Sequence, residues 1–150
     1  MQSAEVGIQR EIASCFANLS LSSNHHVSIA QRAMPDLISL IKCSDVETVR
    51  LSLGALGNLA EGIETHVFMT SSVKTIVDCL EQEEIAVKRE AGRLISNLLS
   101  SCEVHPLIID RGLDSLILLS ANSCQECKYL TASSFHNQGP RYQDEKCIWN

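Results

Sequence analysis

The chain has 150 residues, of which 45% are hydrophobic and only 4% aromatic, so aliphatic side chains must fill most of its core. Its formal net charge of −6 argues against a nucleic-acid-binding protein, which needs a basic patch to displace counterions from phosphates. No apolar run reaches the roughly 20 residues that span a bilayer, so direct membrane insertion is not expected. The first residues match neither a signal peptide nor a myristoylation site, and we therefore expect a cytoplasmic or nuclear protein.

Three segments of the chain repeat one another at a nearly constant interval. Each begins with an arginine, continues through bulky and small apolar residues, and ends in the dipeptide Asn-Leu. The asparagines are Asn18, Asn58 and Asn97, which lie 40 and 39 residues apart. A period of this size is typical of helical solenoids, whose units cannot bury their apolar faces alone. The sequence therefore predicts an all-α helical solenoid of about three repeats with partial ends.

Other positions repeat in step with the asparagines. A histidine stands eight residues after each Asn, a large apolar residue follows three positions later, and a patterned apolar block comes next. Several independent positions agree at one period, so chance is a poor explanation. The histidines are His26, His66 and His105, and the apolar residues are Ile29, Met69 and Ile108.

Taken in chain order, the pattern first gives an incomplete unit and then two repeats of three helices each. Residues 1–22 supply only a third helix. Residues 23–62 form a repeat with helices at 26–33, 36–42 and 46–61, and residues 63–101 form a repeat with helices at 66–72, 74–82 and 85–100. The acidic residues Asp45 and Glu84 precede the third helices, where they suit a helix N-terminus. Gly62 is placed to end the first of these third helices.

The C-terminal part of the chain follows the repeat less closely. Residues 102–138 form an incomplete or divergent repeat, with helices at 106–111 and 114–121 separated by Gly112, and a further third helix beginning at 129–137. Residues 139–150 are a polar tail that we expect to be disordered. Because both ends lack a complete unit, we expect either an excerpt of a longer array or a chain that closes its open ends by self-association.

The third helices have a face that carries the asparagines. At 100° per residue, Asn58 shares its face with Gly54, Leu51 and Glu47, whereas Ala55, Leu56 and Leu59 point toward the core. Stacked units would align the asparagines as a ladder on an exposed concave surface. We assign the same face to two further sets: Asn97, Arg93, Glu90 and Val87, and Asn18, Ser14, Glu11 and Gly7.

These residues resemble the armadillo-repeat superfamily, in the manner of its catenin-like and vacuolar-anchor-like scaffold members. The carriers are the Asn-Leu ends of the third helices, the block Arg-Ala-Met-Pro-Asp-Leu-Ile-Ser-Leu-Ile at 32–41 and the block Arg-Gly-Leu-Asp-Ser-Leu at 111–116. The resemblance covers about residues 8–137. Importin-like members carry Trp one turn before the Asn, but Ser14, Gly54 and Arg93 stand there in this chain, so binding of nuclear-localisation signals is not expected.

The resemblance implies a non-catalytic scaffold that holds an extended segment of a partner protein in the groove of third helices. In that family the solenoid is right-handed and the Asn side chain hydrogen-bonds the backbone of the bound peptide, which implies a right-handed solenoid here and this role for Asn18, Asn58 and Asn97. The alternative for the asparagines is a purely structural role, since Asn can also bond neighbouring loops and helices. We add Arg50, Arg89, Arg93 and Glu90 as groove residues. The arginines either pair with Glu47 and Glu90 on a solvated face or meet acidic groups of the peptide. The alternative is a structural segment that acts through its solenoid ends.

The remaining chemistry-bearing residues point to no enzyme. We expect no catalytic residue, metal, cofactor or small-molecule substrate, because no nucleophile–base set, phosphate loop or carboxylate pair stands out. The three histidines lie in separate units, too far apart to share a metal, and we expect them to mark helix starts. Cys124 and Cys127 have a metal-like spacing but lack a second pair. An odd count of seven cysteines, mostly in apolar patterns, indicates reduced, packed thiols.

Overall fold

The computed structural model describes residues 4–122 and residue 132, and these are helices and connecting turns without a strand. The all-helical fold class predicted from the sequence is thus confirmed for this part of the chain. The α-helices are α1 (Ala4–Leu19), α2 (His26–Leu40), α3 (Val46–Leu59), α4 (His66–Met69), α5 (Val73–Asp78), α6 (Ile85–Leu98) and α7 (His105–Asn122). Short 3-10 helices are η1 (Ser23–His25), η2 (Ile63–Thr65), η3 (Thr70–Ser72) and η4 (Cys79–Glu81).

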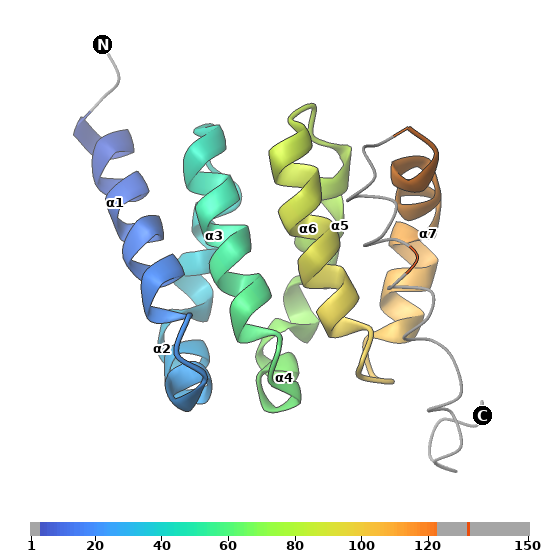
Figure 1. Ribbon diagram of the computed structural model, residues 1–150, viewed down its shortest axis with the longest axis horizontal. Coiled ribbons are helices and arrows are strands. Elements are labelled where there is room, and N and C mark those ends of the chain that lie inside the picture. The colour runs from blue at the N-terminus through green and yellow to red at the C-terminus, as the bar shows by residue number, and fades with distance from the viewer. Residues whose placement is uncertain (1–3, 123–131, 133–150) are drawn as a thin grey trace.

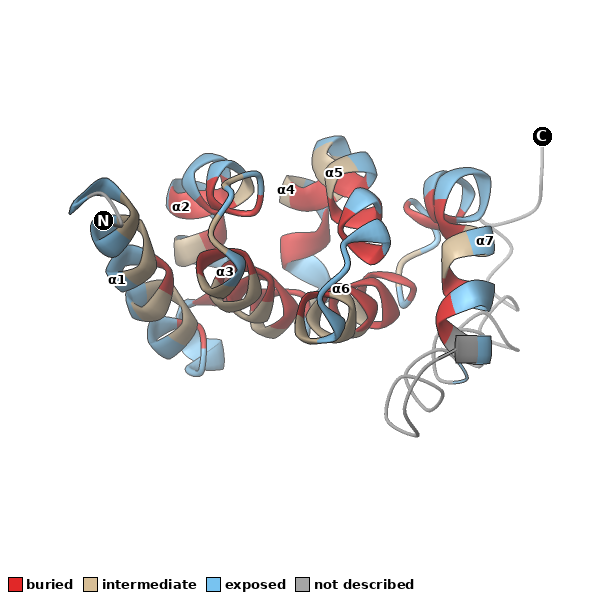
Figure 2. Ribbon diagram, turned by 90° about the horizontal axis from the view of Figure 1, so that it is seen from above, coloured by how far each residue is buried: buried red, intermediate tan, exposed pale blue. Residues whose placement is uncertain are grey.

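The helices lie in two layers. Helices α1, α3 and α6 stand side by side in one layer, and α3 packs along both of its neighbours (Figure 1). Helices α2, α4 and α5 form the second layer, and α7 packs against α5 and α6 (Figure 2). The three helices that end in Asn-Leu are therefore neighbours in space, although 39 or 40 residues separate them in sequence.

The core lies between the two layers and along the contacts within the first layer. Leu53, Leu56 and Leu59 of α3 are fully buried, and Leu94, Ile95 and Leu98 occupy similar places on α6. Each full burial of an aliphatic side chain is worth about 1.5–3 kcal/mol. The expectation that Ala55, Leu56 and Leu59 face the core is confirmed.

The C-terminal carbonyls of α3 account for much of how the units connect. The last carbonyls of a helix have no partner within the regular helix. Here the Leu56 carbonyl accepts from Ala60 N–H, the Asn58 carbonyl from Glu61 N–H, and the Leu59 carbonyl from Gly62 N–H and the Thr65 hydroxyl. Two carbonyls are left for side chains from further away. The Gly57 carbonyl accepts from Asn97 of the next unit, and the Ala60 carbonyl from His66.

The helix boundaries differ from the sequence prediction in several places, and the helices expected at 66–72 and 74–82 each pass into a 3-10 helix, as α4 followed by η3 and α5 followed by η4. The expected helices at 26–33 and 36–42 are one helix, α2, with Pro35 inside it; buried Met34 and Leu37 on either side of Pro35 keep the segment packed. The expected break at Gly112 is absent from α7. Gly112 is buried there, and a Cβ on it would stand 3.2 Å from the Val77 side chain, so this glycine serves close packing.

The third helices also end earlier than predicted. Helix α3 ends at Leu59 and α6 at Leu98, because their last turns tighten into shorter-range backbone bonds. Gly62 was expected to end α3, but it lies three residues beyond the last residue of that helix, and no described glycine has a positive φ. Gly62 instead precedes η2 with an ordinary φ of −94°.

The cysteines follow the sequence prediction only in part. Cys15, Cys43 and Cys79 are free, and burial raises the pKa of the Cys79 thiol to about 11. Cys102 is disulfide-bonded, so the expectation of reduced thiols throughout is wrong at this position. Spacing in sequence does not disclose such a pairing, because two cysteines bond through proximity in space.

Cys124 and Cys127, the polar tail and all of 129–137 except residue 132 lie outside the described residues. Across the described part of the chain, no helix has the length and apolar character needed to cross a membrane.

The start of α3 is tied to α1 by one carboxylate. Asp45 caps α3 by accepting from Thr48 N–H at 2.9 Å and from the Thr48 hydroxyl at 2.7 Å. Arg10 of α1 donates to both oxygens of the same carboxylate, at 3.2 and 2.6 Å. These bonds to Arg10 and Thr48 hold the pKa of Asp45 well below its usual range. The cap predicted at Asp45 is confirmed, whereas the Glu84 side chain makes no capping bond.

Replacing Asp45 separates the capping bond from the ion pair. We expect Asp45→Ala to lower the free energy of unfolding at pH 7 by about 1–2 kcal/mol, through loss of the cap. Asp45→Asn, which still caps, should lose less. Because the folded pKa is depressed, the contribution of the ionised carboxylate is complete above the unfolded pKa of about 3.9 and disappears as the pH falls further. Urea unfolding from pH 7 to pH 3 should show the two variants approaching the wild type at the acidic end; a constant gap would contradict this.

Candidate functional site

The residues predicted to bind a partner lie on the first layer of helices. We call this surface the helix-row face and define it by Asn18 of α1, Asn58 and Arg50 of α3, and Asn97, Arg93, Arg89 and Glu90 of α6. Asn18 is exposed, and the other six residues are half-buried. The predicted residues therefore lie on adjacent helices, at equivalent positions of the sequence repeat.

Asn58 and Asn97 both bond the preceding helix of the row. The Asn97 side chain donates to the Gly57 carbonyl at 2.9 Å. The Asn58 side chain donates to the Ser20 hydroxyl at 3.1 Å, and that hydroxyl donates in turn to the Ala17 carbonyl at 2.9 Å. Ala17 corresponds to Gly57 in the repeat, so Asn58 reaches the equivalent carbonyl through a serine. The asparagine ladder thus links neighbouring helices, which is the structural alternative left open for it from the sequence.

Arg93 is the most connected side chain on the helix-row face. It donates to the Asn58 side-chain oxygen at 3.0 Å, to the Gly54 carbonyl at 2.9 Å, and to the Glu90 carboxylate at 3.0 and 3.1 Å. The guanidinium can lie this close to α3 because residue 57 is glycine. A Cβ there would stand 2.7 Å from an Arg93 nitrogen. Arg93 therefore fastens α6 to α3 in addition to presenting charge.

Arg50 and Glu47 form an ion pair within α3. The Arg50 guanidinium donates to both Glu47 oxygens, at 2.6 and 2.8 Å, and this bonding lowers the pKa of Glu47. About a third of the Arg50 side chain remains exposed. Of the two pairings weighed from the sequence, Arg50 with Glu47 is present, whereas Glu90 pairs with Arg93.

The helical-face assignment was wrong for Val87. This residue is 2% exposed and belongs to the core. It lies ten residues before Asn97, whereas Gly7 and Glu47 lie eleven residues before their asparagines. At 100° per residue, ten positions place a side chain about 80° away from the asparagine instead of 20°.

The three histidines have one and the same role. Each is buried at the start of a helix, and its Nε2 lies within 2.9 Å of the backbone carbonyl six residues earlier. Since a carbonyl can only accept, each Nε2 must carry the hydrogen. The carbonyls belong to Ser20, Ala60 and Leu99, each two residues after the asparagine of its unit. The predicted helix-start role is confirmed, and the ring bond explains why the position is histidine.

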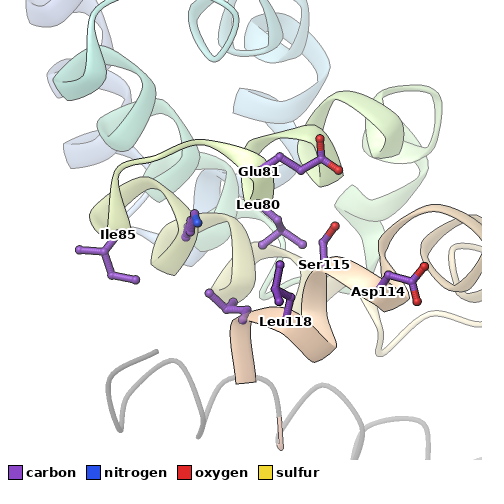
Figure 3. Close-up of a pocket in the computed structure, with 8 residues that line it drawn as sticks. Leu80, Glu81, Ile85, Asp114, Ser115 and Leu118 are labelled. Atoms are coloured by element: carbon purple, nitrogen blue, oxygen red, sulfur yellow. The ribbon is translucent and has the colours of Figure 1, made fainter. Parts of the chain in front are cut away.

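The cavity between η4, α6 and α7 includes none of the predicted residues among the residues that line it. The cavity in Figure 3 has a volume of about 550 Å³ and lies between η4, α6 and α7. Leu80 and Leu118 line it, and the carboxylates of Glu81 and Asp114 point away from these leucines. Within residues 4–122 and 132, no group of three or more His, Cys, Asp or Glu is arranged to hold a metal ion.

Sequence reasoning missed several partners of the inter-helix bonds. Ser20 and Gly57 accept from the asparagines, and Arg10 donates to Asp45. These residues stand at fixed distances from the asparagines, and Arg10 was noted only as part of the repeated segment. The available signal was their register: Arg10 lies eight residues before Asn18, and Asp45 lies thirteen residues before Asn58. A pattern of register alone does not say which two positions touch across neighbouring helices.

Asn58→Ala tests whether the ladder stabilises the fold. It removes the bonds to Ser20 and Arg93, so we expect the free energy of unfolding to fall by about 1–2 kcal/mol. Asn18→Ala is the matched control, because it makes the same change at the same register on an exposed residue, and it should cost less than about 0.5 kcal/mol. Equal losses for the two variants, measured by chemical denaturation, would contradict the structural role of Asn58.

Comparison with known proteins identifies a shared fold. No family model matches the chain, and no curated protein matches it. Two crystal structures of engineered proteins from the Northeast Structural Genomics Consortium are similar, with TM-scores of 0.83 and 0.78 and sequence identities of 24% and 23%. Each alignment covers 91% of this chain, which spans 58% and 59% of the length of the two engineered chains. At such identities the likeness shows the fold alone.

Proposed function

We propose that this chain is a non-catalytic protein-interaction module of the armadillo type, which holds an extended segment of a partner across the helix-row face. The observation that carries the proposal is the alignment of exposed or half-buried polar side chains on three adjacent helices at equivalent positions of the sequence repeat. An extended peptide crossing these helices would meet a similar set of groups at each one. Backbone bonds would supply affinity, and side-chain contacts would supply preference.

The hydrogen bonds of the ladder limit which groups remain for a partner. The Asn58 and Asn97 amide nitrogens already donate to α1 and α3, so they hold the helix row in place. The Asn97 side-chain oxygen stays available to accept from a peptide N–H, since its described hydrogen bond uses the nitrogen alone. Asn58 differs, because its oxygen accepts from Arg93. We therefore assign direct peptide contact to Asn97 ahead of Asn58.

Charge preference would come mainly from Arg50. Arg93 donates to three groups, on Glu90, Asn58 and Gly54. In the described part of the chain, Arg50 pairs with Glu47 on its own helix, and the Glu47 side chain is 43% exposed. An acidic side chain of the partner could share the Arg50 fork with Glu47. Such exposed ion contacts are worth about 0.2–1 kcal/mol and weaken with salt, so the preference for acidic peptides would be modest.

The test is peptide binding measured by fluorescence anisotropy. A library of unstructured, labelled peptides with acidic residues at varied spacing is screened against the wild type and against Arg50→Glu. We expect the best acidic peptide to bind the variant about three- to tenfold more weakly, because one favourable contact becomes a repulsion. The wild-type affinity should fall as salt is raised.

A matched variant separates local contact from net charge. Lys74 is exposed on α5 in the second layer, so Lys74→Glu makes the same change in charge away from the helix-row face. This variant should bind like the wild type. Equal weakening by both variants would show that only net charge matters. If no peptide of the library binds the wild type, the proposed function is overturned.

A further inference from the structure

The outer side of α1 carries an exposed apolar stripe at the end of the helix row. Ile8 is 60% exposed, Ile12 41% and Leu19 57%, and exposed Cys15 lies between the last two. These positions are spaced by four, three and four residues, so they lie along one side of the helix. Much of α1 is exposed or half-buried, whereas α3 and α6 carry long buried stretches (Figure 2).

The same register positions are buried in both other helices of the row. In α3 they are Thr48, Ser52, Ala55 and Leu59, all 0% exposed, and in α6 they are Val87, Ala91, Leu94 and Leu98, at most 2% exposed. In the row, α1 lies beside α3 and α3 lies beside α6 (Figure 1). The stripe of α1 is thus the surface that, in the other two units, faces the preceding helix.

A groove continues this surface into the second layer. Phe16 and Leu19 of α1, together with Ile29 and Ala33 of α2, line a cavity of about 350 Å³. The equivalent residues of the next unit are Leu56, Leu59, Met69 and Val73, and none is more than 2% exposed. The apolar surface left open on α1 and α2 therefore matches in position what is fully buried one unit further along.

Polar groups at both ends of the stripe match a contact already present between α1 and α3. There, Asp45 accepts from Arg10, and Asn58 donates to Ser20. The register equivalents of Asp45 and Asn58 on α1 are Glu5, in its first turn, and Asn18, and both are exposed. A helix seated on α1 as α1 is seated on α3 would place an arginine near Glu5 and a hydroxyl or carbonyl near Asn18.

We propose that the stripe of α1 docks an amphipathic helix of a partner protein, parallel to α1, with an arginine facing Glu5 and its C-terminal turn facing Asn18. Two observations indicate this occupant. A helix on the stripe would continue the series of α1–α3 and α3–α6 contacts, and the acidic charge of Glu5 favours an arginine opposite it. This docking does not depend on peptide binding at the helix-row face. It buries apolar side chains that otherwise remain in water, which is favourable in proportion to the apolar area buried.

The experiment uses α1 itself as the probe, because α1 is the helix that already makes this contact with α3. A labelled peptide of residues 4–22 is held helical by a hydrocarbon staple joining positions 8 and 12, which blocks its own stripe and leaves Arg10 and Ser20 free. Its binding to the full chain is followed by fluorescence anisotropy. We expect saturable binding that is at least tenfold weaker for Ile12→Asp and unchanged for Val67→Asp, a control at a 63% exposed residue of α4.

A charge exchange provides the second readout and does not depend on how Ile12→Asp folds. Glu5→Arg in the chain should weaken binding about three- to tenfold, and Arg10→Glu in the peptide should restore most of it. No saturable binding to the wild type, or no rescue by the exchange, would overturn the proposal. Concentration-dependent dimerisation of the chain alone, lost in Ile12→Asp, would also overturn it, because a second copy would then be the occupant.

Discussion

The C-terminal carbonyls of the first-layer helices are the constraint on which the arrangement depends. A helix leaves its last carbonyls without regular partners, and burying them unpaired costs about 1–3 kcal/mol each. In this chain, two side chains pair with such carbonyls at the end of α3. They are a histidine from the next helix along the chain and an asparagine from the next helix in the row. The first bond sets how the chain turns after α3, and the second sets how α6 lies against it. The repeated histidine and asparagine positions of the sequence supply these bonding partners, and the repeated apolar positions supply the core.

This constraint changes how the polar face of the helix row should be understood. A row of asparagines looks like a peptide-binding ladder, yet Asn58 is engaged through both ends of its amide, to Ser20 and to Arg93. Polar residues on this face therefore stabilise the packing of the helices, and any role in binding a partner falls to the side-chain atoms that these bonds do not use. At Asn97 the nitrogen donates to α3, and on the proposed function the side-chain oxygen would accept from the partner. Exposed Asn18 lies where the row ends, next to apolar residues that nothing in the described chain covers.

Periodicity predicted the helical class, the side-by-side placement of equivalent positions and the core residues well, because burial follows the helical period directly. It failed where a single contact decides the outcome. Gly112 was read as a break, but its lack of a side chain makes room for Val77 inside a continuous helix. Gly57 drew no attention, although Arg93 can approach α3 only because that residue is glycine. Partners such as Ser20 and Asp45 could not be named, because a period fixes which positions are equivalent and leaves the pairing across neighbouring helices open.

The most direct test of this account is the protonation pattern of the histidine rings in solution, measured by long-range nitrogen–proton correlation NMR. His26, His66 and His105 each need a hydrogen on Nε2 to cap a carbonyl. At His66 the other nitrogen, Nδ1, is buried with no hydrogen-bond partner in the described part of the chain, which leaves it no acceptor for a proton. The account predicts the Nε2–H tautomer for all three rings, and the fourth described ring, exposed His25, serves as the reference. An Nδ1–H tautomer in the buried rings would contradict the capping bonds, and with them the explanation for the repeat.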